Sequence, residues 1–126
     1  MIAIPERIEI DVPSIGGKCW MLDRAGVFVL EVGEGVLRTC ACTHAGSGSL
    51  RIYDGVPDEN GFLPDPEDGD LSPAGRDLLW MPQTVMGSWM LDAGFIKGLT
   101  IVCPGGHEGM APVATIVWMP RAKPRT

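Results

Sequence analysis

Three residues whose side chains bind metals occupy every second position of one segment: Cys40, Cys42 and His44. In an extended strand such residues lie on one face and form a row. Neighbours in the row are about 6.8 Å apart, whereas zinc ligand atoms lie about 2.0–2.3 Å from the metal. A straight strand cannot bring all three to one ion, and a site would need Cys103 or His107 from elsewhere. We therefore expect no metal site, and the same spacing argues against a Cys40–Cys42 disulfide.

The sequence lacks the motifs that surround the residues of hydrolytic and phosphate-binding sites. His44 and His107 both lie beside glycine-rich turns, and Ser47 and Ser49 lie in a loop of small residues. No Gly-x-Ser-x-Gly elbow surrounds either serine, and no lysine follows Gly46 at the spacing of a phosphate-binding loop. We expect no catalytic residue, no cofactor and no enzymatic activity.

Acidic residues concentrate in one stretch of the chain. Residues 54–77 hold eight of the sixteen acids and a single base, Arg76. The run 65–70 resembles a calcium loop at first, but an EF-hand starting at Asp65 would have Asp70 where glycine is needed and Arg76 where glutamate is needed. A solvated, proline-rich loop over about 55–76 is the expected structure, and loops of this length are often functional.

The charged loop and the two terminal segments, 1–7 and the basic tail 120–126, are the expected partner-binding elements. Such segments can become ordered on a partner and wrap around it. The expected contact residues are Asp58, Glu59, Asp65, Glu67, Asp68, Asp70, Arg121, Lys123 and Arg125.

Tryptophans and cysteines are expected in the core. Trp20, Trp80, Trp89 and Trp118 all lie in apolar runs, which favours packing over a platform for stacking sugars. A carbohydrate site stays open as the alternative, and it would need an exposed aromatic pair beside Asp or Asn. The four cysteines, including Cys19, also lie in apolar or strand-like runs, so we expect buried free thiols.

Composition bounds the class of protein. A chain of 126 residues with 45% hydrophobic residues has room for one globular domain, 1–126. The formal net charge of −6 argues against nucleic-acid binding. No basic leader and no apolar run of about 18 residues are visible, so we expect synthesis in a cytoplasm and no membrane partner.

Short alternating runs separated by Gly and Pro predict an all-β fold. No window repeats apolar residues with helical period, and the pattern favours a β-sandwich or jelly roll of about eight short antiparallel strands. Residues 40–55 (CACTHAGSGSLRIYDG) predict a β-hairpin, because two strand-like runs flank a loop of small residues. The expected strands are 6–12, 18–22, 27–32, 36–44, 49–54, 77–81, 86–93, 97–103 and 112–119.

Four blocks of the sequence together resemble a known class of proteins. They are Gly48–Gly55 (GSLRIYDG), Phe95–Ile101 (FIKGLTI), Pro104–His107 (PGGH) and the terminal run Val113–Trp118. This succession of strands and turns resembles small β-rich virion proteins of tailed bacteriophages, with the head decoration (cement) proteins as the nearest class. The acidic insert at 56–76 departs from the compact pattern.

The resemblance implies binding and no turnover. It implies a virion structural protein, made in the host cytoplasm, that binds and stabilises the head shell as a homo-oligomer. The partner would be the major capsid protein or another virion protein. The alternative is a carbohydrate- or receptor-binding β-sandwich on a virion or cell surface.

Overall fold

The computed structural model describes residues 5–9, 17–46, 48–59, 76–104 and 112–121. This part of the chain forms nine strands and no helix, so the predicted all-β class is confirmed. It accordingly contains no helix that could cross a membrane. The strands are β1 (Glu6–Arg7), β2 (Lys18–Leu22), β3 (Gly26–Val32), β4 (Gly35–His44), β5 (Leu50–Asp54), β6 (Asp77–Met81), β7 (Gly87–Phe95), β8 (Gly98–Cys103) and β9 (Val113–Pro120).

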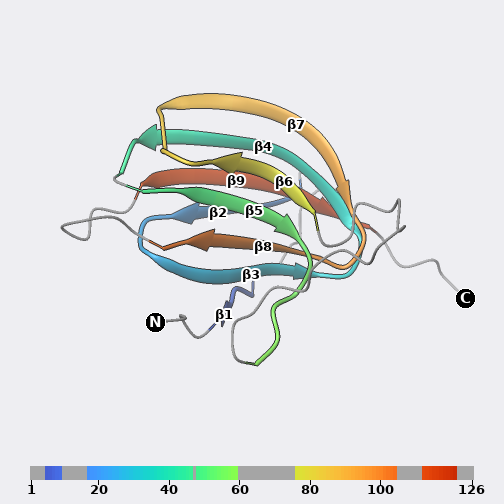
Figure 1. The fold of residues 1–126 in the computed structure, drawn as a ribbon. Helices are drawn as coiled ribbons and strands as arrows, with labels where there is room; N and C mark the ends of the chain where they lie inside the picture. Colours follow the sequence, from blue (N-terminus) through green and yellow to red (C-terminus); the bar gives the residue numbers. More distant parts are fainter. Residues whose placement is uncertain (1–4, 10–16, 47, 60–75, 105–111, 122–126) are drawn as a thin grey trace, which may run out of the picture.

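The strands form two sheets that pack face to face (Figure 1). One sheet has the order β1-β3-β8-β5-β6 and the other has the order β2-β9-β4-β7. In Figure 1 the sheets lie one behind the other, with β7 at the top and β1 at the bottom; β6 and β2 are the other two edge strands.

The pairing is nested about the segment between β5 and β6. β5 pairs with β6, β4 with β7, β3 with β8 and β2 with β9, all antiparallel. The chain is thus one long hairpin whose tip is the 55–76 segment. Rolling that hairpin brings β9 beside β4 and β8 beside β5 and divides the strands between two sheets. This arrangement is a jelly roll with the short β1 added at one edge.

Alternation along the strands places the core between the two sheets. Leu37, Cys40 and Cys42 of β4 are buried on its inner face, opposite residues such as Ile52 and Ile101 of the other sheet. Such alternation is expected for strands with one face on the core. The largest fully buried side chain is Trp118 on β9.

The predicted hairpin over 40–55 is wrong. β4 and β5 do not pair with each other, because β4 belongs to one sheet and β5 to the other. The loop after His44 crosses from one sheet to the other, and Thr84 holds it there: the Thr84 hydroxyl donates to the Gly46 carbonyl at 2.8 Å, and the Thr84 amide donates to the Gly48 carbonyl at 3.0 Å. β5 instead finds its hairpin partner in β6, across the long acidic segment.

The predicted first strand, 6–12, is shorter in the structure. Only Glu6 and Arg7 pair, in parallel with Phe28 and Val29 of β3, and the Ile8 amide adds one further bond to the Val29 carbonyl at 2.9 Å. Residues 10–12 lie outside the described residues.

A buried carboxylate fixes the point where the hairpin tip leaves the sandwich. Asp54, the last residue of β5, is fully buried. Its side chain accepts hydrogen bonds from three consecutive amides of the turn between β7 and β8: Ile96 at 3.0 Å, Lys97 at 3.0 Å and Gly98 at 3.4 Å. Its own amide donates to the Arg76 carbonyl at 2.9 Å, next to β6. One residue therefore joins β5, the start of β6 and the β7–β8 turn.

We predict that Asp54→Asn lowers the free energy of unfolding by about 1–3 kcal/mol, because an amide group replaces an acceptor oxygen where backbone N–H groups converge. The control is Asp92→Asn, which removes only an exposed ion pair with Arg38 and should cost less than about 1 kcal/mol. Urea unfolding of both variants measures the difference, and equal losses would contradict the role given to Asp54.

Candidate docking surface

The row of possible metal ligands does not converge on a site. Cys40 and Cys42 point into the core, whereas His44 is exposed at the end of β4, beyond a register shift. Cys103 is buried on β8, and His107 lies outside the described residues. In the described part of the chain no three Cys, His, Asp or Glu side chains lie close enough together to hold a metal ion.

Burial makes the inner thiols unreactive. Loss of solvation raises the pKa of Cys40 to about 12, with a smaller contribution from neighbouring Cys42. Burial also raises the pKa of Cys42, whose thiol donates a hydrogen bond to the His44 carbonyl at 3.4 Å. The prediction that all four thiols are buried is wrong for Cys19, which is exposed on the outer face of the edge strand β2.

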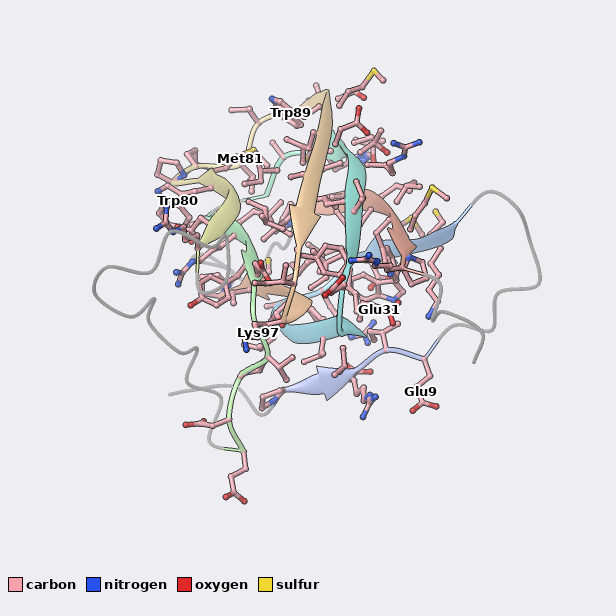
Figure 2. The ribbon with its side chains drawn as sticks, turned by 90° about the vertical axis from the view of Figure 1, so that its right-hand side faces the viewer. Glu9, Glu31, Trp80, Met81, Trp89 and Lys97 are labelled. Carbon is pink, nitrogen blue, oxygen red and sulfur yellow. The ribbon has the colours of Figure 1, made fainter. Side chains whose placement is uncertain are left out.

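The tryptophans divide between core and surface. Trp118 is fully buried, and its indole N–H donates to Glu31 at 3.0 Å, while Trp20 and Trp89 pack partly buried against the core. The prediction of core packing is wrong for Trp80, which is 52% exposed on β6. Figure 2 shows Trp80 on the side of β6 that faces away from β7. Among the described aromatic residues it is the single exposed indole rather than one of a pair.

Only three of the predicted partner-binding residues fall within the described part of the chain. Asp58 and Glu59 are exposed just beyond β5, and Arg121 follows β9, where it pairs with Glu34. The structure does not bring Arg121 together with the two acids. Asp65, Glu67, Asp68, Asp70, Lys123 and Arg125 lie outside the described residues.

A polar pocket of about 250 Å³ lies between β1 and β3, lined by Arg7, Glu9, Lys18 and Glu31 among others. Figure 2 shows Glu9 and Glu31 on the same side of the molecule. Glu31 is already neutralised by Lys18 at 3.0 Å and hydrogen-bonded to the Trp118 indole. These contacts explain Glu31 as a structural residue at the end of the sandwich.

Sequence reasoning missed the surface with the most distinctive chemistry, the outer face of the β2-β9-β4-β7 sheet, which we call the uncharged face. Its side chains form rows across the four strands, as the register shows. One row is Cys19, Val117, Thr39 and Met90, the next is Met21, Thr115, Ala41 and Ser88, and a third is Met119, Val36 and Gly94.

No residue of these three rows is charged, although the protein carries a net charge of −6. The described charges on this face are paired: Arg38 contacts Asp92 at 2.9 Å, and at the end of the face Arg121 pairs with Glu34. Three methionines stand out from the face: Met21 is 54% exposed, Met90 is 82% exposed and Met119 is 37% exposed. Methionine is over-represented on protein-binding surfaces because its flexible thioether adapts to a partner. The signal in the sequence was the scarcity of charge at outward positions of four strands, where Arg38 and Asp92 are the exceptions.

One end of the uncharged face is hollowed by a notch of about 540 Å³. Val36, Gly94 and Met119 contribute to its apolar lining, and the paired residues Arg38 and Arg121 contribute to its border. A Cβ atom built on Gly94 would meet nothing within 4 Å. The space above Gly94 is therefore open to a side chain from outside.

Comparison with known proteins identifies no relative of this chain. The chain matches no protein-family model, no curated protein and no solved structure.

We predict that one thiol per chain, Cys19, reacts with iodoacetamide in the native protein, while all four react after unfolding. At about pH 9 a thiol of ordinary pKa is largely ionised, but Cys40 keeps its proton in the fold, so native labelling should still stop at one. Mass spectrometry locates the label, and Cys19→Ser is the control that abolishes it. Native labelling of Cys40 would contradict the packing of β4.

Because the unfolded thiol ionises and the folded one does not, Cys40 also makes the free energy of unfolding fall as pH rises above about 8.5.

Proposed function

We propose that this protein is a non-catalytic structural subunit that binds other protein subunits in a bacteriophage virion, as decoration proteins bind the head shell. The observation that carries the proposal is the uncharged face. Specific interfaces are depleted of charge at their centre and enriched in methionine and aromatic residues. A four-stranded face with this composition, on an acidic protein, suits contact with protein rather than with nucleic acid.

The rest of the described site agrees with binding and offers no support for turnover. The buried polar groups are already engaged in the fold, as Asp54 is by the β7–β8 turn and Thr100 by the Gly55 carbonyl. A subunit that binds only the assembled shell stabilises that shell by mass action. The acidic hairpin tip adds a second contacting element, leaving the sandwich between Asp54 and Asp77.

We predict that the protein sediments with empty phage heads and that Met21→Glu reduces the bound fraction about tenfold or more, because it buries an unpaired charge at the contact. Val32→Glu is a matched control: Val32 is 49% exposed, similar to Met21, but belongs to β3 of the other sheet. The control should bind normally. A wild-type protein that stays in the supernatant at high concentration would contradict the proposed function.

A further inference from the structure

The uncharged face carries a projecting side chain and an open notch on the same strand. Met90 is 82% exposed on β7, and Gly94, four residues later on β7, lies in the notch of about 540 Å³. We propose that a second copy of this chain covers the face: two copies dock back to back, and Met90 of each enters the notch of the other. This inference rests on the proposed function, since it names the partner of the same face.

Two-fold symmetry makes a projection and a hollow on one face complementary to themselves. A two-fold axis lying in the interface and crossing β7 near Asp92 brings position 90 of one copy over position 94 of the other. The chain bulges there, with Asp92 at a φ of 43° and a register shift between β4 and β7. The notch of about 540 Å³ is larger than one methionine side chain.

Charge favours this arrangement over others that two copies could adopt. Each copy carries a net charge of −6, and half of its acids lie within residues 54–77. That stretch connects β5 to β6, and both strands belong to the sheet opposite the uncharged face. Back-to-back docking therefore keeps the β5 and β6 ends, between which the acidic stretch runs, on opposite sides of the two copies. The described charges that it brings together are already paired, Arg38 with Asp92 and Arg121 with Glu34.

The area is sufficient for a specific contact. Four strands, with about eight residues on β9, span roughly 19 by 27 Å, or about 500 Å² in projection per copy. The two copies together reach about 1,000 Å² before side-chain relief is counted, which is where specific interfaces begin. Stacked sheets of this kind pack about 10 Å apart.

Gly94→Val separates docking from folding. The new side chain points into open space, and valine suits an extended strand better than glycine does, so the isolated chain should unfold at the same or a higher urea concentration. The same side chain fills the notch, and we expect the dissociation constant of the dimer to rise about tenfold or more. Sedimentation velocity over a wide range of protein concentration, without phage heads, measures it. Met90→Ala should weaken the dimer as well, by removing the projecting side chain.

Val32→Ala is the matched control, since Val32 is 49% exposed but belongs to β3 of the other sheet. It should leave the dimer unchanged. A wild-type protein that stays monomeric throughout, or a Gly94→Val dimer of unchanged affinity, overturns the inference. A protein that dimerises as expected but does not sediment with heads overturns the proposed function and leaves the dimer standing.

Discussion

The Asp54 carboxylate accepts hydrogen bonds from three consecutive amides, and the nested pairing of the strands meets at that point. When a long hairpin rolls into two sheets, its innermost strand pair, β5 and β6, must be fixed in position relative to β7 and β8. Asp54 does this from the end of β5, because the turn it binds connects β7 of one sheet to β8 of the other. The same residue marks where the acidic segment leaves the sandwich. The acidic segment therefore begins and ends at strands of the β1-β3-β8-β5-β6 sheet, whereas the uncharged face belongs to the other sheet.

The sequence predicts the strands well and their partners poorly. Alternation of apolar and polar residues is local, so the bounds of segments such as 77–81 and 18–22 agree with β6 and β2. Pairing is not local: β2 and β9 are neighbours although most of the chain separates them. The loop after His44 has the composition of a hairpin turn, yet the neighbours of β4 are β7 and β9, because rolling the long hairpin places β5 in the other sheet. Burying the inner faces of both sheets stabilises the fold more than the local turn preference of this loop would stabilise a β4–β5 hairpin.

The site errors have the same physical origin. Trp80 and Cys19 lie in apolar runs like those of the core, but both belong to edge strands, where an outward side chain has no layer to cover it. The uncharged face is not visible in the sequence because its residues come from four strands that lie far apart along the chain, and no single position is unusual by itself. Only the register aligns Cys19, Val117, Thr39 and Met90 into a row. Three adjacent rows without a charged residue, on a protein of net charge −6, are a property of the assembled sheet.

The central claim is that this face is covered in the assembly, and the protein's own methionines can report on it. Mild peroxide oxidises exposed methionine to the sulfoxide, and mass spectrometry follows each site separately in free protein and in protein bound to phage heads. The account predicts that Met21, Met90 and Met119, which are 54%, 82% and 37% exposed in the isolated chain, become protected in the head-bound protein relative to free protein diluted until it is monomeric. Equal oxidation of these three methionines in the two samples would contradict it.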